Sequence, residues 1–314
     1  MQIIKIHHPH TFKGDEFPPL AIALGYFDGV HTGHRQVIQT AIEAGKEKGL
    51  QTAVMTFDPH PSVILNKEVK HVRQLTPMNE KVALIEQMGI DYLFIVHFTK
   101  EFASLSPEAF VKEYLISLNV KHIVAGFDYT YGHRGKGTME DLPMYTHGQI
   151  AQTIVSKQEL DSEKISSTRI RKELISGKVE ETARLLGRPF NVKGQVVDGE
   201  KRGRLLGFPT ANVEVDPDYY LPGVGVYCVR MLVKGAWHNG ICNVGYKPTF
   251  HSEKEEIPTV EVHLLDFEDH IYGEEVTVKW CTRIRDEKKF EGLDALIAQL
   301  EQDKRFAAEY FENF

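Results

Sequence analysis

The sequence is poor in cysteine and has no long apolar run. Three cysteines (Cys228, Cys242 and Cys281) occur in 314 residues, widely spaced and without a CxxC pair, so neither a disulfide framework nor a cysteine zinc site is expected. No uncharged apolar stretch approaches the roughly 20 residues of a membrane helix. The N-terminal MQIIKIHHPH lacks the apolar centre of a secretory signal. These absences favour a protein of the reducing cytoplasm.

Basic residues are also fewer than acidic ones. The chain has 37 Lys and Arg against 44 Asp and Glu, which gives a formal net charge of −7. Nucleic-acid binding needs a clustered basic surface, so no nucleic-acid partner is expected, and no membrane partner either. Self-association is compatible with the composition, but no pattern selects an oligomer. Any phosphate-bearing ligand is expected to bind at a local site.

The first 186 residues alternate between strand and helix patterns. Continuous apolar strands between helices predict a parallel sheet that is covered on both faces. Thr76 and Ser106 each precede a proline, and we expect both to cap a helix. The predicted strands are Leu20–Phe27, Thr52–Phe57, Tyr92–Phe98, His122–Phe127 and Ile150–Ser156. The predicted helices are His34–Lys48, Pro77–Met88, Pro107–Leu118, Ser167–Ile175 and Val179–Leu186.

The pattern changes after residue 186. Short strands separated by Gly and Pro turns predict an antiparallel barrel or sandwich, followed by a last helix with the stripe Leu293, Leu296, Ile297 and Leu300. We therefore expect two domains, 1–186 and 187–314. The predicted strands of the second are Val192–Val197, Ala211–Val215, Val226–Val233, Trp237–Val244, Thr259–Asp266 and Glu275–Ile284.

The most informative stretch of the first half is Gly25–His34 (GYFDGVHTGH). It leaves a strand and enters a helix, which is where parallel sheets bind ligands. Gly29 and Gly33 allow close approach of a phosphate to the free N–H groups of the helix start. His31 and His34 lie three residues apart, on one helix face, where two donors can stabilise charge on a phosphate under attack. Two ordinary surface histidines or a zinc site are the alternatives.

Three further motifs accompany this HxGH turn: Thr56–Pro61 (TFDPHP), Val124–His133 (VAGFDYTYGH) and Ile165–Arg171 (ISSTRIR). Hydroxyls at a helix start and an arginine fork suit phosphate, although simple capping or loop geometry explains single members. Together the four motifs resemble the adenylyltransferase module of the bacterial bifunctional riboflavin kinase/FAD synthetase family. The resemblance covers roughly 1–186. It implies a Rossmann-like nucleotidyltransferase fold and transfer of AMP from ATP to flavin mononucleotide (FMN).

The resemblance extends the expected nucleotide and flavin site beyond the two histidines. Arg171 matches the family's phosphate-binding arginine, and Asp128 stands where the family often has Asn. The region of Asp58 and His60 lies near the flavin and its phosphate in that family. The remaining expected binding residues are Gly25, Phe27, Asp28, Gly29, Gly33, Ser166, Ser167 and Thr168.

A glycine-rich loop joins two strands of the second half, within Gly194–Asn212 (GQVVDGEKRGRLLGFPTAN). Glycines with cations favour a phosphate cradle, although this is no Walker A sequence. Thr210 and Asn212 flank Ala211 and are expected on one face of a strand, where two neutral oxygens suit Mg²⁺ held with ATP. A plain turn before a strand is the alternative. The other candidate binding residues here are Gly199, Lys201, Gly203, Arg204, Gly207 and Pro209.

This loop resembles the riboflavin kinase signature, Gly-Phe-Pro-Thr-Ala-Asn. Pro222–Tyr227, Asn243–Phe250 and Val260–Phe267 add to the likeness, which covers roughly 187–314. It implies a six-stranded antiparallel Greek-key β-barrel with Mg²⁺–ATP at Thr210 and Asn212. Glu261 matches the catalytic carboxylate, which can deprotonate the ribityl hydroxyl as it attacks the γ-phosphorus. An exposed strand carboxylate is the alternative for Glu261.

The two resemblances together predict an enzyme that makes FMN from riboflavin and ATP, and then FAD and pyrophosphate from FMN and ATP. Two other functions are compatible with parts of the pattern. A monofunctional FAD synthetase with a flavin-binding barrel would not need Thr210, Asn212 and Glu261 together. A flavin-sensing regulatory module linked to RNA is disfavoured by the acidic net charge.

Overall fold

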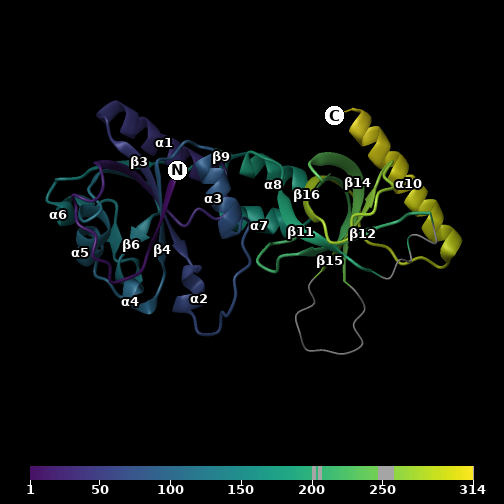
Figure 1. The fold of residues 1–314 in the computed structure, drawn as a ribbon, viewed down its shortest axis with the longest axis horizontal. Helices are drawn as coiled ribbons and strands as arrows, with labels where there is room; N and C mark the ends of the chain where they lie inside the picture. Colours follow the sequence, from purple (N-terminus) through teal and green to yellow (C-terminus); the bar gives the residue numbers. More distant parts are fainter. Residues whose placement is uncertain (200–202, 204–206, 247–257, 314) are drawn as a thin grey trace. The chain divides into compact units, whose positions relative to one another are not determined.

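The computed structural model describes residues 1–199, 203, 207–246 and 258–313. The chain divides into two compact units, Met1–Ser167 and Thr168–Phe314 (Figure 1). Each unit has its own sheet and its own core, and each is described separately below.

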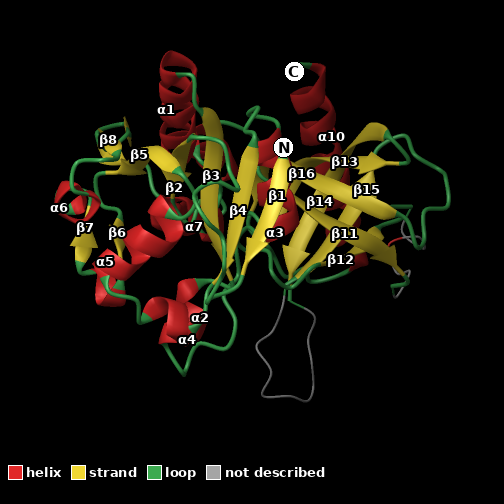
Figure 2. Ribbon diagram, turned by 60° about the vertical axis from the view of Figure 1, so that its left-hand side comes forward, coloured by secondary structure: helices red, strands yellow, loops and turns green. Residues whose placement is uncertain are grey.

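A six-stranded parallel sheet forms the centre of the first unit (Figure 2). All neighbouring strands are parallel. The carboxyl ends of these strands therefore share one edge, where ligand sites form in open sheets. The strand order is β1 (Gln2–Ile6), β4 (Tyr92–His97), β3 (Gln51–Asp58), β2 (Leu20–Leu24), β5 (Val120–Gly126) and β8 (Ala151–Val155).

Both faces of this sheet are buried, which explains why its central strands are apolar throughout. Ala23 of β2 packs on the face covered by α1 (Thr32–Lys48) and α3 (Met78–Glu86). Ile22 and Leu24 point to the other face, which is covered by α5 (Pro107–Phe110) and the π-helix η1 (Val111–Ile116). The predicted parallel sheet with helices on both faces is confirmed.

Shorter elements complete the first unit. They lie in the connections that follow the strands. They are α2 (Pro61–Leu65), α4 (Lys100–Ala103), β6 (Thr130–Tyr131), η2 (His133–Gly135), β7 (Gly137–Thr138), α6 (Leu142–Thr146), β9 (Glu159–Leu160) and β10 (Glu163–Lys164).

Besides these unpredicted short elements, local structure differs from the sequence expectation at three further places. The edge strand β1 was not predicted, because in this short strand only Ile6 is buried. Thr76 does not cap α3: the cap residue is Pro77, without a side-chain hydrogen bond. Ser106 does cap α5, by accepting the Ala109 N–H, but the helix predicted to Leu118 changes to π-helical bonding after Phe110.

The second unit is built on a closed six-stranded antiparallel barrel, as predicted. The strands follow a non-sequential order, so β12 pairs with β15 and not with the next strand of the chain. Arg285 and the buried Asp303 form an ion pair of 2.7 Å between the barrel and the last helix, α10 (Leu293–Glu312). The order is β11 (Asn191–Val197), β12 (Ala211–Val215), β15 (Thr259–Leu264), β14 (Ala236–Gly245), β13 (Gly225–Val233) and β16 (Glu275–Arg285).

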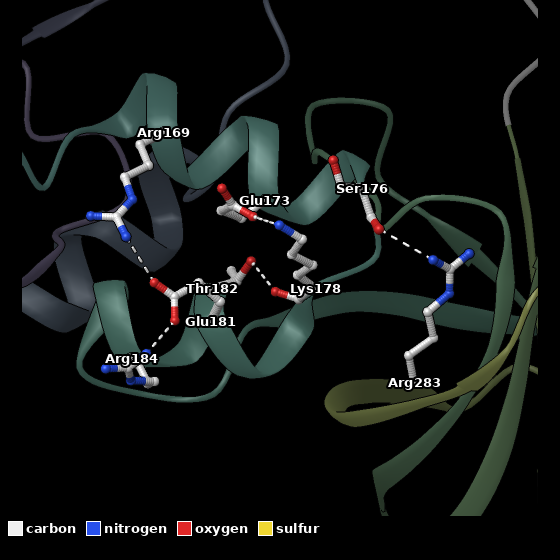
Figure 3. A network of polar contacts seen from close by, with 8 residues as sticks. All are labelled: Arg169, Glu173, Ser176, Lys178, Glu181, Thr182, Arg184 and Arg283. Atoms are coloured by element: carbon white, nitrogen blue, oxygen red, sulfur yellow. Dashed lines mark hydrogen bonds and ion pairs between the residues drawn. The ribbon is translucent and has the colours of Figure 1, made fainter. Parts of the chain in front are cut away.

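Two helices precede the barrel, α7 (Ser167–Ile175) and α8 (Val179–Leu186). Glu181 of α8 binds Arg169 at 2.9 Å and Arg184 at 2.6 Å, and Arg283 of β16 donates to the Ser176 carbonyl at 3.2 Å (Figure 3). These contacts group α7 and α8 with the barrel. The division by contacts falls at the start of α7, between Ser167 and Thr168, whereas the functional boundary expected at residue 186 stays a prediction.

Candidate active sites

The turn between β2 and α1 has an unusual backbone. Phe27 (φ 56°) and Val30 (φ 39°) adopt the left-handed region, which non-glycine residues rarely occupy, and Gly29 has φ 88°. A Cβ on Gly25 would lie 2.8 Å from the Phe27 ring, so only glycine fits beneath that ring. The turn delivers His31 as the N-cap residue of α1.

The two histidines of the HxGH motif lie together, as their spacing predicted. Their rings stack with centroids 3.5 Å apart, and the Phe27 ring meets His34 edge-on at 5.3 Å. His31 Nδ1 accepts the His34 backbone N–H at 3.2 Å, which leaves Nε2 to carry the proton of the neutral ring. A Cβ on Gly33 would lie 3.2 Å from the His31 ring, so the absence of a side chain at Gly33 leaves space for that ring.

Asp28 connects this turn to the segment before α3. Asp28 is 2% exposed, and its carboxylate accepts hydrogen bonds from the backbone N–H groups of Leu75 (3.2 Å) and Thr76 (3.1 Å). The Ser167 hydroxyl donates to the Asp28 carbonyl at 2.9 Å. These bonds fix the conformation of the turn, and a direct contact of Asp28 with ligand stays a prediction.

The backbone carbonyl of Tyr26, the residue before Phe27, accepts two hydrogen bonds. The Tyr26 carbonyl accepts the Thr56 hydroxyl (2.8 Å) and the Lys81 ammonium (2.9 Å). Lys81 is fully buried, and burial lowers its pKa to about 8, although the charges of Asp28 and Asp58 raise it. Lys81 was not predicted as a site residue. Lys81 lies on the apolar stripe of α3 with Met78, Val82 and Ile85. A charged residue within such a stripe is the sequence feature that could have marked it as a site residue.

Asp58 and His60 lie at the carboxyl end of β3. Asp58 is exposed, and His60 caps α2 through Nδ1, which accepts the Ser62 N–H at 3.1 Å. The His60 ring meets the Tyr26 ring edge-on at 4.5 Å. The structure thus places His60 beside the β2–α1 turn, whereas its contact with a flavin phosphate stays a prediction.

The Asp128 carboxylate, which follows β5, is ion-paired with Lys164 of β10. Lys164 also lies 4.6 Å from the centre of the exposed Phe127 ring. A positive partner therefore balances the carboxylate at the position where the resembling family often has Asn. This pairing joins residues 36 positions apart and could not be predicted from the sequence.

The ISSTRIR motif opens α7 as predicted. Ser166 and Ser167 belong to the first unit, whereas Thr168 and Arg171 belong to the second. The Arg171 guanidinium lies 5.5 Å from the centre of the Tyr220 ring. Phosphate binding by these four residues stays a prediction.

Three polar side chains line up across neighbouring strands of the barrel. Glu261 of β15 pairs in register with Asn212 of β12 on one side and with Asn243 of β14 on the other. Residues in register point to the same face of a sheet, so the three side chains form a row. Val260 and Val262 are buried on the opposite face. Asn212 and Glu261 were singled out from the sequence, whereas Asn243 was quoted in a motif without a role.

The glycine-rich loop approaches this row closely. A Cβ on Gly199 would lie 2.0 Å from Asn212 Nδ2, and one on Gly203 would lie 2.3 Å from the Phe208 carbonyl oxygen and 3.5 Å from Thr210 Oγ1. Gly207 (φ 81°) turns the chain before Pro209, whose carbonyl contacts His263 Nδ1 at 2.8 Å. The predicted site residues Lys201 and Arg204 lie outside the described residues.

The donor set fits a magnesium ion that is carried by a nucleotide. Thr210 and Asn212 offer neutral oxygens close to Gly203 and Gly199, and Mg²⁺ takes few protein ligands of this kind. Within the described residues, no group of three or more His, Cys, Asp or Glu side chains is arranged to hold a metal. None of the helices in the same part of the chain is long and apolar enough to cross a membrane.

Two family models match the chain. The FAD synthetase model matches residues 15–169, and the riboflavin kinase model matches residues 186–311. The first match includes the β2–α1 turn, β3 and α3 but ends before Arg171 of α7, and the second includes the barrel strands β12, β14 and β15.

Curated relatives match over nearly their whole length. The bifunctional riboflavin kinase/FMN adenylyltransferase of Bacillus subtilis is 48% identical over 100% of this chain and 99% of its own. Its namesake from Escherichia coli is 35% identical over 92% of each chain. A crystal structure named as a macrolide-efflux protein from Streptococcus pneumoniae is 35% identical, covers 98% of this chain and 99% of its own, and has a TM-score of 0.87.

Proposed function

Because this chain belongs to the family of bifunctional riboflavin kinase/FMN adenylyltransferases, we propose that it makes FMN and then FAD through two independent sites. The first reaction is ATP-dependent phosphorylation of riboflavin. The second transfers AMP from ATP to FMN and releases pyrophosphate. Residues 1–186 would carry the adenylyltransferase and residues 187–314 the kinase.

The β2–α1 turn supports AMP transfer. An FMN phosphate oxygen attacks the α-phosphorus of ATP, and the bond to the leaving pyrophosphate breaks without a covalent enzyme intermediate. His31 Nδ1 accepts the His34 N–H at 3.2 Å, so Nε2 carries the proton of the neutral ring and is the nitrogen that can donate. With His34 stacked on it, His31 can stabilise the charge that builds on the phosphates. Ser166, Ser167, Thr168 and Arg171 would hold further phosphate oxygens.

The polar row of the barrel supports phosphorylation of riboflavin. Glu261 accepts the proton of the terminal ribityl hydroxyl, whose oxygen attacks the γ-phosphorus of ATP, and ADP leaves. Asn212 lies in register beside Glu261, which would bring nucleotide and hydroxyl to the same face. Thr210 and Asn212 would hold Mg²⁺, which would neutralise charge on the ATP phosphates.

One observation carries the proposal: the stacked His31–His34 pair and the Asn212–Glu261 pair lie in different units, and a different family model matches the stretch that holds each pair. A barrel that only bound flavin would not need Thr210, Asn212 and Glu261 beside a phosphate-cradling loop. The substrates are small molecules, and the three free cysteines fit the cytoplasm expected from the sequence.

The experiment is a product assay on the purified chain. It is incubated with ATP and Mg²⁺ and either riboflavin or FMN, and riboflavin, FMN and FAD are separated. The proposal expects FMN and FAD from riboflavin, and FAD from FMN. A monofunctional FAD synthetase would give FAD only from supplied FMN, and a flavin sensor would give neither product; either result refutes the proposal.

A further inference from the structure

A fully buried lysine lies directly behind the β2–α1 turn. Lys81 of α3 has 0% exposure, and its Nζ lies 2.9 Å from the Tyr26 carbonyl and 4.1 Å from the centre of the Tyr26 ring. A buried charge is costly unless it is paired, and α3 is otherwise anchored by apolar residues such as Ile85. Packing alone would favour another apolar residue at this position.

Lys81 binds the backbone carbonyl of Tyr26, the residue that directly precedes the strained part of the turn. Phe27, the next residue, has φ 56°, and Val30 has φ 39°. Backbone of this kind persists only where its surroundings determine it. Lys81 and the Thr56 hydroxyl both donate to the Tyr26 carbonyl, and Asp28 accepts the amides of Leu75 and Thr76. The segment 75–81 thus holds the turn at Tyr26 and at Asp28.

Two carboxylates near Lys81 favour a charged side chain at this position. Asp28 faces it from the turn and Asp58 from the end of β3, and both favour its protonated form. The ammonium in turn offsets the negative charge of two carboxylates close to the site proposed to bind a triphosphate. Without it, the carboxylates would repel the phosphates.

We propose that Lys81 is a positioning residue for AMP transfer, whose buried ammonium fixes the Tyr26 carbonyl and so holds His31 and His34 in the orientation that meets the phosphates. Lys81 acts through the backbone and not by touching substrate. This inference rests on the proposed adenylyltransferase function of the first unit.

Two substitutions separate positioning by charge from simple packing. Lys81→Met removes the ammonium but keeps an unbranched apolar side chain, whereas Lys81→Arg keeps the charge and a donor in a larger side chain. We expect Lys81→Met to lower kcat for FAD formation from FMN by about 10²-fold, the scale of a misplaced catalytic group. KM for ATP and FMN should stay near wild type, and Lys81→Arg should recover much of kcat. A packing role predicts the reverse order, because arginine overfills the space and methionine does not.

The chain supplies its own controls. Riboflavin phosphorylation by the barrel should be unchanged in every Lys81 variant, and Lys46→Met, at an exposed position of α1, should leave both activities unchanged. Thr56→Val removes the second donor to the Tyr26 carbonyl with little change in volume, and it should also lower kcat for FAD formation. If Lys81→Met does not fold, Lys81→Arg and Thr56→Val decide: an active Lys81→Arg with an impaired Thr56→Val supports the inference.

The inference is overturned if folded Lys81→Met makes FAD at the wild-type rate, or if Lys81→Arg is the more damaged of the two. Full activity of Thr56→Val alongside an inactive, folded Lys81→Arg also overturns it. Failure of the proposed function itself is distinct, because the wild-type chain would then form no FAD from FMN.

Discussion

Removing the Lys81 charge is expected to change the pH dependence of stability in a defined direction. Burial lowers the pKa of Lys81 from 10.5 to about 8 in the folded chain. Between these values the unfolded chain holds the proton that the folded chain has lost, so the stability of the first unit rises with pH across this window. Lys81→Met has no such group, and its stability should lack this rise.

The size of the effect follows from the shift. A difference of 2.5 between the pKa values 10.5 and about 8 corresponds to about 3 kcal/mol. Most of this, about 2 to 3 kcal/mol, should appear between about pH 7 and about pH 10. At neutral pH the buried ammonium therefore lowers the free energy of unfolding of the first unit. Lys81→Met should be at least as stable as wild type at this pH, while it makes FAD more slowly. The Tyr26 carbonyl keeps the Thr56 hydroxyl as donor.

The assay must report the first unit. Trp237 and Trp280, the two tryptophans of the chain, both lie in the second unit, so their fluorescence follows the barrel. Urea unfolding of the first unit is measured by amide hydrogen exchange of β2, β3 and β5 at neutral and alkaline pH, for wild type and Lys81→Met. Groups that titrate in both proteins cancel in the difference. A difference that is constant with pH would refute the reasoning.

Four further predictions concern the sites and one buried ion pair. In wild type, kcat for FAD formation should fall as pH rises through about 8, when Lys81 loses its proton among Asp28, Asp58 and Tyr26, whereas Lys81→Arg should keep its rate in a pH profile. His31→Ala or His34→Ala should lower the FAD-forming rate by at least ~10²-fold and spare FMN formation, so near-normal FAD synthesis by both would contradict the site. Gly199→Ala places a Cβ 2.0 Å from the Asn212 amide and should lower FMN formation about 10²-fold without changing FAD formation from FMN; equal effects on both steps would count against the barrel site. Asp303→Ala leaves Arg285 unpaired in a largely buried place and should destabilise the barrel by about 3 kcal/mol in tryptophan-detected urea unfolding, and an unchanged midpoint would show that the pair is dispensable.

The periodicity of apolar residues predicted much of the fold, and short spacings within a motif predicted which of its side chains lie together. The three-residue spacing at a helix start predicted that His31 and His34 share one face, where their rings stack. The change in periodicity after residue 186 predicted the barrel, whereas the two units divide by contacts after Ser167. The edge strand β1 was missed because a short, mostly exposed strand leaves little apolar pattern. The capping expected of Thr76 failed because α3 begins at Met78, one residue later than expected, which makes Pro77 and not Thr76 the N-cap residue.

Long-range pairings required the structure. The row Asn212, Glu261 and Asn243 depends on β12 pairing with β15, two strands that are not consecutive, and register between such strands is not encoded locally. The Asp128–Lys164 pair is of the same kind. Lys81 could be predicted only in part. The sequence shows its position on an apolar stripe, but the Tyr26 carbonyl that it binds lies 55 residues earlier in the chain.

Independence of the two active sites is tested most directly by assaying Glu261→Ala and His31→Ala side by side. With ATP and Mg²⁺, Glu261→Ala should convert supplied FMN to FAD at the wild-type rate but form no FMN from riboflavin. His31→Ala should convert riboflavin to FMN at the wild-type rate and stop there. Loss of both steps in either variant would contradict two separate sites.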